Sequence, residues 1–248
     1  MAKESELIRR IRDLSERSEK TSTVTHSSFL TPAEQYEVDL WLKYKGTRFV
    51  WDGGYPDAER KIVFFYSEWG EGDIQPEQYI SCVKITAGFG TPSHRDYLGS
   101  ILGLGLRREW IGDIIVSDNT AYIMCLVPAD ATVINELNHV SRYGVKCEKI
   151  PLISVPVPKK IVKHLSFTVQ SRRFDAIVGG VFGISRSRAV KLIAGGHATL
   201  NYKECDKNDA YVEDGDVISV RGLGKAVLIG QSGQSRKGRL YLSAERYL

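Results

Sequence analysis

The sequence predicts an α+β protein built from three consecutive parts. These are an N-terminal helical segment over residues 1–75, a β-α-β-β-α-β unit over residues 76–160, and a C-terminal unit of two helices on a small antiparallel sheet over residues 165–248. Apolar residues recur at helical spacing in some segments and alternate in others, which separates helices from strands. Capping residues and glycines mark the helix ends. The composition, 42% hydrophobic and 26% charged, is that of an ordinary globular chain.

The N-terminal segment contains two predicted helices. Apolar residues between positions 7 and 14 form one narrow stripe, so we expect a helix over residues 1–20. Residues 21–28 are polar and indicate a linker. Thr31, Pro32 and Glu34 then form a helix start, with Thr as N-cap, Pro at the first helical position and Glu three residues after the cap. This second helix is expected to run to about Lys45, before Gly46.

The central part alternates strands and helices. After an earlier strand at Ile62–Tyr66, we expect strands at Ile80–Thr86, Trp110–Val116, Ala121–Val127 and Val145–Ile150, and helices over residues 94–105 and 128–139. This order is that of a ferredoxin-like plait. RNA-recognition motifs share it, but their aromatic signature is missing here. Pro151, Pro156 and Pro158 indicate a strand or an ordered connector, with a domain boundary near residues 160–170.

The C-terminal part predicts two helices joined by a tight turn. Phe174, Ile177, Val178 and Val181 share one helical face, and Gly183 ends that helix. Ser185 is placed as the N-cap of the second helix, which ends at Gly195-Gly196. Short strands are expected after it, at residues 197–200, 217–220, 226–229 and 240–242.

Positive charge is concentrated at the beginning of this part. The whole chain carries a formal net charge of +4, whereas residues 158–203 contain nine Lys or Arg and one acid, Asp175. A basic block on a mildly acidic body is typical of nucleic-acid binders. On charge alone, a solvated Lys/Arg face is the favoured interpretation.

The placement of these charges favours phosphate binding. The N-terminus of a helix attracts anions through its exposed amides and its dipole, and guanidinium and hydroxyl groups add hydrogen bonds to phosphate oxygens. We therefore hypothesise that two cationic helix starts flank one RNA backbone. This requires Arg173, Arg186 and Arg188 to point to the same side and not to form ion pairs with internal carboxylates. Asp175, in the first turn of its helix, is expected to have a structural role, because a carboxylate there interacts favourably with the helix dipole. The predicted RNA-binding residues are Arg172, Arg173, Ser185, Arg186, Ser187, Arg188, Lys191, Lys203 and Arg221.

About 55 residues of this C-terminal part resemble the S4 RNA-binding domain. The motifs are Arg173-Phe174-Asp175, Ser185-Arg186-Ser187-Arg188-Ala189, Leu192-Ile193 with Gly196, and Asp214-Gly215-Asp216-Val217-Ile218-Ser219-Val220-Arg221-Gly222. Phe174 stands where the family often has Leu, and the position stays apolar. The resemblance implies recognition of structured RNA.

The preceding part is similar to the YlmH family of bacteria and plastids, which includes the photosystem II S4 domain proteins of cyanobacteria. The motifs are Gly53-Gly54-Tyr55-Pro56-Asp57-Ala58-Glu59-Arg60, His94-Arg95-Asp96-Tyr97-Leu98-Gly99, Leu104-Gly105-Leu106-Arg107-Arg108 and Ile111-Gly112-Asp113. Members carry a plait before a C-terminal S4 domain. The resemblance implies binding to ribosomal RNA and tRNA on the large ribosomal subunit, in quality control of stalled complexes. Relatives are also linked to cell division and photosystem II assembly.

We expect no catalytic site and no cofactor. His94-Arg95-Asp96 lacks the Asn that a kinase loop needs five residues after its Asp, because that residue is Ile101. Gly88-Phe89-Gly90 lacks the third glycine of a dinucleotide loop. An RNA-modifying enzyme with its site in the plait, and a protein-assembly factor, remain alternatives. A second RNA contact is predicted at His94, Arg95, Arg107 and Arg108.

Partners and compartment follow from composition. The four cysteines form no C-x-x-C pair and have no His at metal-ligand spacing, which predicts free thiols, no metal site and a reducing compartment. The chain has no apolar run near the roughly 20 residues of a membrane span. We expect a monomer in the cytoplasm, with the plastid stroma as an alternative.

Overall fold

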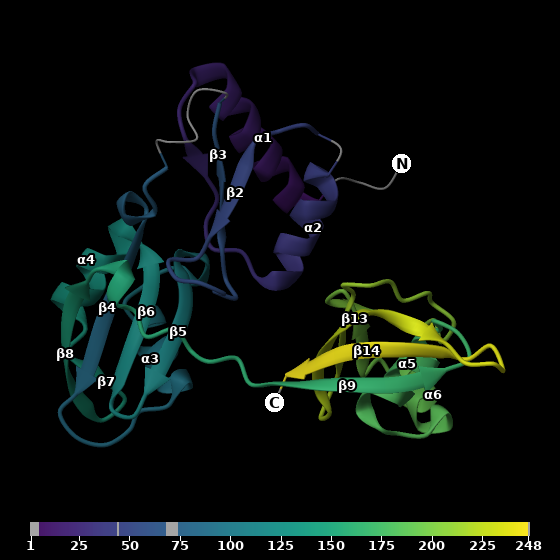
Figure 1. The fold of residues 1–248 in the computed structure, drawn as a ribbon. Coiled ribbons are helices and arrows are strands. Elements are labelled where there is room, and N and C mark those ends of the chain that lie inside the picture. The colour runs from purple at the N-terminus through teal and green to yellow at the C-terminus, as the bar shows by residue number, and fades with distance from the viewer. Residues whose placement is uncertain (1–4, 44, 68–73, 248) are drawn as a thin grey trace. The chain divides into compact units, whose positions relative to one another are not determined.

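The computed structural model describes residues 5–43, 45–67 and 74–247, and it divides into two compact units, Met1–Pro158 and Lys159–Leu248 (Figure 1). The first unit contains α1 Glu6–Thr21, β1 Thr25–His26, α2 Pro32–Leu42, β2 Phe49–Asp52, β3 Ile62–Phe65, β4 Ile80–Ala87, α3 His94–Leu102, β5 Ile111–Ser117, β6 Thr120–Leu126, α4 Val127–Glu136, β7 His139–Val140 and β8 Tyr143–Ile150. The second contains β9 Val162–Val169, α5 Phe174–Phe182, α6 Arg186–Ala194, β10 Ala198–Leu200, β11 Lys203–Glu204, β12 Val217–Val220, β13 Gly224–Gln234 and β14 Leu240–Tyr247.

The first helices form where local capping predicts them. The predicted capping box is confirmed, because the Thr31 side chain accepts from the Glu34 amide and the Glu34 carboxylate accepts from the Thr31 amide. Both helices contribute to a core with a three-stranded sheet of order β1-β3-β2. The prediction of a plain linker over residues 21–28 is wrong in part, since Thr25 and His26 pair with β3. Residues 1–4 of the expected first helix lie outside the described residues.

The central sheet is antiparallel throughout, with strand order β5-β6-β4-β8-β7. Its strands and helices follow one another in the predicted order, β-α-β-β-α-β, with the two-residue strand β7 added. The side chains on one face, such as Val83 and Ile123, form a core with Tyr97 of α3 and Val133 of α4. Both helices therefore cover the same face of the sheet.

The opposite face of the central sheet is covered at one end by the N-terminal segment. Cys82 of β4 and Met124 of β6 are fully buried, in one cluster with Phe29 and Phe64. Gly112 permits this contact, because a Cβ added there would lie 2.7 Å from a ring carbon of Phe29. This part of the sheet face is therefore closed to a ligand.

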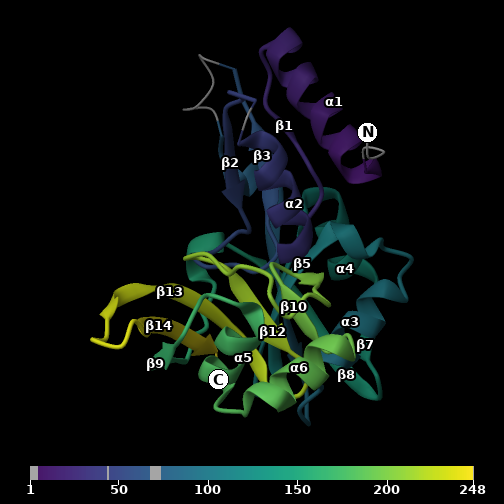
Figure 2. The ribbon, with the colours of Figure 1, turned by 90° about the vertical axis from the view of Figure 1, so that its right-hand side faces the viewer.

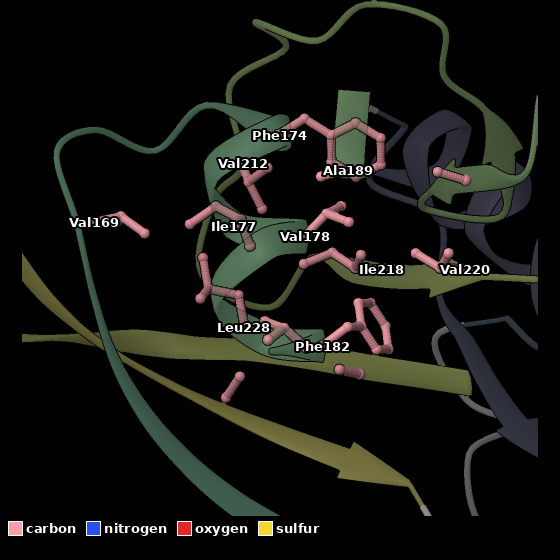
Figure 3. Close-up of a cluster of buried hydrophobic side chains, with 14 of the residues drawn as sticks. Val169, Phe174, Ile177, Val178, Phe182, Ala189, Val212, Ile218, Val220 and Leu228 are labelled. Atoms are coloured by element: carbon pink, nitrogen blue, oxygen red, sulfur yellow. The ribbon is translucent and has the colours of Figure 1, made fainter. Parts of the chain in front are cut away.

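The second unit is a six-stranded antiparallel sheet of order β11-β10-β12-β13-β14-β9 with two helices. Figure 2 shows α5 and α6 side by side against its strands, and Figure 3 shows α5 packed on Ile218 and Leu228. Gly180 lets α5 lie on β9, since a Cβ there would be 2.2 Å from Phe167 Cδ2. The sequence predicted no strand over residues 162–169, and this is wrong, because β9 pairs with β14 along its whole length.

Candidate nucleic-acid interface

The start of α6 presents hydroxyl and guanidinium groups to solvent. Ser185 is the N-cap, as predicted, and its Oγ accepts from the amide of Arg188 at 3.3 Å. Its hydroxyl also lies 3.1 Å from that of Ser187. Arg186 and Arg188 are exposed, and the first turn contains no acidic residue. A helix N-terminus with these groups provides the charge and the donors that a phosphate requires.

Arg186 reaches back along the neighbouring helix. Gly179 of α5 faces the turn before α6, where an added Cβ would lie 3.2 Å from the Ile184 carbonyl oxygen and 4.0 Å from the Arg186 nitrogen. The Arg186 side chain donates from Nε and Nη2 to Asp175 Oδ2, at 3.1 and 3.0 Å. The packing of two helices thus brings together charges that lie eleven residues apart.

Asp175 holds Arg173 as well. Arg173 donates from Nε to Oδ1 at 3.2 Å and from Nη2 to Oδ2 at 3.1 Å. Asp175 is only 2% exposed, whereas the side chains of Arg173 and Arg186 are 40% and 61% exposed. Burial raises the pKa of Asp175, but hydrogen bonds from both arginines outweigh that effect and hold the pKa below its usual value. The carboxylate therefore stays ionised and leaves the cluster with one net positive charge.

These ion pairs correct the hypothesis of free arginines. Arg173 and Arg186 do share a side, but both are bound to an internal carboxylate. Arg172 is further removed from solvent, because its Nη1 contacts Asp214 Oδ1 at 2.6 Å and its side chain is 11% exposed. The hypothesis depends on Arg173, Arg186 and Arg188. Of these, Arg188 has no carboxylate pair within the described part of the chain.

The start of α5 is closed as well, which corrects the idea of two open helix starts. The amide of Phe174 donates to the Ala210 carbonyl at 2.8 Å, and the amide of Asp175 donates to the Asn208 carbonyl at 2.9 Å. The loop that supplies these carbonyls belongs to residues 204–216, which contain six acids and one lysine. Residues 186–203, by contrast, contain four Lys or Arg and no acid. Electrostatics therefore direct an anion to α6 rather than to α5.

The remaining predicted cations of this unit continue beyond the start of α6. Lys191 is exposed in its last turn. Arg221 and Lys203 are exposed near the opposite end of the helix, where the Arg221 amide donates to the His197 carbonyl at 2.8 Å. Nine residues of α-helix span about 13 Å, so these charges form a row rather than one cluster.

The predicted second RNA contact, at His94, Arg95, Arg107 and Arg108, does not form one cluster. His94 and Arg95 are exposed in the first turn of α3, which Ser93 and Asp96 cap. Arg107 and Arg108 follow the other end of that helix. Arg107 lies over the ring of Trp110 at 5.6 Å.

Arg108 is partly buried in the first unit. Its Nη1 donates to the Ile111 carbonyl oxygen, and its side chain is half-buried. Burial and the neighbouring Arg60 lower the pKa of this guanidinium. One edge of the Arg108 guanidinium is therefore occupied by the backbone at Ile111.

Sequence reasoning missed a cluster of hydrogen bonds around the Asp113 carboxylate, here called the Asp113 clasp. The Asp113 carboxylate accepts from the Tyr55 hydroxyl at 2.8 Å and from the amides of Glu59 and Arg60 at 2.6 and 3.1 Å. Arg60 also donates to the carbonyls of Ile111 and of the N-terminal segment. The motifs at residues 53–60 and 111–113 signalled that these segments matter, but not that they contact each other.

The described residues form neither a metal-binding cluster nor a membrane-spanning helix. Across residues 5–43, 45–67 and 74–247, no three His, Cys, Asp or Glu side chains are placed to hold a metal ion. No helix in these ranges is both long and apolar enough to span a membrane.

Comparisons with known proteins match most of the chain. A family model described as "YlmH, N-terminal" matches residues 3–68, and one described as "Putative RNA-binding domain in YlmH" matches residues 77–154. A curated relative, the ribosome-associated protein quality control protein P2 of Bacillus subtilis (strain 168), is 28% identical over 223 residues, which cover 89% of this chain and 86% of the relative. A solved structure, the cell division protein ylmH from Streptococcus pneumoniae, matches with a TM-score of 0.51 at 20% identity, over 62% of this chain and 96% of that one. At that identity the structural likeness concerns the fold alone.

Proposed function

The chain belongs to the YlmH family, and on that premise we propose that it is a non-catalytic factor that binds structured RNA on the ribosome through residues 159–248. The observation that carries the proposal is the exposed start of α6, where Ser185, Arg186, Ser187 and Arg188 stand without a neighbouring acid in the same turn. The name of the Bacillus subtilis relative supports the ribosome as the place of action.

We also propose S4 and ferredoxin-like identities for the two sheets. Two adjacent helices on one face of an antiparallel sheet, with the quoted motifs at the helix starts, support an S4 domain at residues 165–248. The antiparallel order β5-β6-β4-β8, with both helices on one face, supports a ferredoxin-like plait at residues 76–160. Ribosomal RNA, with tRNA, on the large subunit is the RNA that the family resemblance favours.

In this proposal the RNA backbone follows α6. Ser185, Ser187 and Arg188 bind one phosphate at the helix start, and Arg186 adds the outer edge of its guanidinium while Asp175 holds the inner edge. The row formed by Lys191, Lys203 and Arg221 binds further phosphates. Arg172 is excluded because its charge is neutralised by Asp214. Recognition of this kind reads the shape and the backbone of folded RNA.

Two charge-reversal variants test the binding site. Arg188→Glu removes an exposed cation from the start of α6, and Lys20→Glu makes the same charge change on α1, where the lysine side chain is 74% exposed. We expect Arg188→Glu, but not Lys20→Glu, to abolish co-sedimentation with large ribosomal subunits and to weaken binding of a ribosomal RNA fragment. Equal affinities for the two variants would refute the proposed site.

Salt dependence and RNA chemistry provide further tests. Each neutralised phosphate contributes about 0.7–0.9 to the slope of log affinity against log salt, so Arg188→Ala is expected to reduce that slope by about one such increment. The non-catalytic part is tested by mass spectrometry of RNA from cells with and without the protein. Loss of a modified nucleoside would replace this part of the proposal with an RNA-modifying activity.

A further inference from the structure

A large aromatic ring is exposed at one end of the central sheet. Phe89, in the loop between β4 and α3, is 65% exposed. Its ring lies against Tyr143 at the start of β8, with centroids 5.4 Å apart and planes at 75°. One edge of Phe89 is therefore packed while most of the ring remains in water. A single exposed apolar side chain is common on protein surfaces, so the neighbours of Phe89 decide whether it forms a binding surface.

The loop holds this ring in place. The amide of Gly88 donates to the Gly144 carbonyl at 3.1 Å, which fixes the loop to β8. Gly90 has a φ of +73°, and a Cβ added there would lie 2.4 Å from Cε1 of Tyr143. Position 90 thus requires glycine both for its positive φ and for its close contact with Tyr143. These interactions fix the conformation of the loop that carries Phe89.

One cation lies beside the Tyr143 ring, and two more belong to the adjoining segments. Arg142 lies 5.3 Å from the centroid of Tyr143, and its Nη2 donates to the tyrosine oxygen at 3.2 Å. The two segments that meet here, residues 88–95 and 141–146, carry Arg95, Arg142 and Lys146 and no acidic residue. All three cations are exposed. An exposed ring bordered by positive charge matches a nucleobase with its phosphate better than an apolar protein surface.

We propose that Phe89, Tyr143 and Arg142, here called the Phe89 cluster, stack on an unpaired RNA base. The base lies on the free surface of Phe89, and the adjacent phosphate contacts Arg142 or Arg95. Single-stranded nucleotides are required because only unpaired bases expose a whole face for stacking. The buried sheet positions at Cys82 and Met124 cannot take this role, since the N-terminal segment covers them.

The inference rests on the proposed RNA binding for its ligand class, but it uses different residues in the other unit. The two can therefore fail separately. The probes are a blunt ribosomal RNA hairpin and the same hairpin with a long unpaired tail that carries 2-aminopurine. Full-length protein is used throughout, and affinity is measured by fluorescence anisotropy.

Wild-type protein should bind the tailed hairpin about tenfold more tightly than the blunt one and quench the 2-aminopurine, as expected for one stacked base. Phe89→Ala and Phe89→Leu should lose this tenfold gain and the quenching, and Phe89→Trp should keep both. Ile153→Ala, which removes another exposed apolar side chain from the same unit, should match the wild type.

Four outcomes overturn the inference. If the wild type binds both hairpins equally, the Phe89 cluster takes no base while the proposed RNA binding stands. If Phe89→Leu keeps the gain, the RNA tail binds without aromatic stacking at Phe89. If Phe89→Ala weakens both hairpins equally, the residue is structural. If the wild type binds neither hairpin, the proposed function fails as well.

Discussion

Asp175→Asn separates the positioning of two arginines from the total charge of the site. The carboxylate accepts four N–H groups, two from Arg173 and two from Arg186. An amide keeps one acceptor oxygen and places a donor where the other oxygen was, opposite a guanidinium. It also removes the negative charge that makes these hydrogen bonds strong.

The expected loss of stability is about 1–3 kcal/mol. It is smaller than for a fully buried ion pair, because Arg173 and Arg186 are 40% and 61% exposed and regain water when the carboxylate is lost. All four tryptophans lie before residue 111, so their fluorescence does not report on α5 and α6. Amide hydrogen exchange of peptides from these helices is the suitable measurement.

RNA affinity should fall in Asp175→Asn although the net positive charge of the protein rises. Asp175→Asn makes the protein more positive, so electrostatics alone predict tighter RNA binding. Because the variant frees both guanidinium groups from their fixed orientation, we expect weaker binding. Asp206→Asn, the same charge change at an exposed residue of the same unit, should bind at least as tightly as the wild type. Unchanged or tighter binding by Asp175→Asn would refute the positioning role.

The pH dependence of stability has a defined direction. The pKa of Asp175 is lowered in the folded protein, so its contribution is complete above the unfolded value of about 3.9 and is lost as the pH falls through the folded value. The stability difference between wild type and Asp175→Asn should therefore be constant near neutral pH and shrink below about pH 4. A difference that persists at the lowest pH that allows folding would contradict this origin.

Two further substitutions test the packing. Gly180→Ala should destabilise the second unit by about 1–3 kcal/mol, because the new Cβ would overlap the ring of Phe167; hydrogen exchange of β9 and α5 measures this loss. Gly99→Ala, at an open helix position, should not lower the stability of the protein, which thermal denaturation measures. Tyr55→Phe should cost about 0.5–1.5 kcal/mol, because it removes one of the hydrogen bonds to Asp113, and unchanged denaturation by urea, followed by tryptophan fluorescence, would contradict the clasp.

Helix starts were predictable because the interactions that make them are local. The Thr31 and Ser185 hydroxyls both accept from an amide three residues later, so sequence spacing alone locates them. Helix ends were less accurate, and α3 stops at Leu102 rather than near residue 105. Several strands were missed for the opposite reason. The two-residue strand β1 exists only through its pairing with Phe64 and Phe65 of β3.

The candidate site divides in the same way. The sequence alone located a basic block in the C-terminal third, the N-cap at Ser185 and the exposed cations beside it. It did not indicate that Asp175 would bind two of those arginines, or that Asp214, 42 residues from Arg172, would neutralise a third. Nor did it indicate that an acidic loop would close the start of α5.

The amino-acid sequence by itself determined which residues are charged, where helices begin and which faces are apolar, because those properties depend on residues a few positions apart. Tertiary structure decided which charges remain available to a ligand. Ion pairs form between residues that helix packing and loop docking bring within about 3 Å, and the packing of α6 against α5 brings Arg186 to Asp175. The open start of α6 is what remains after that pairing.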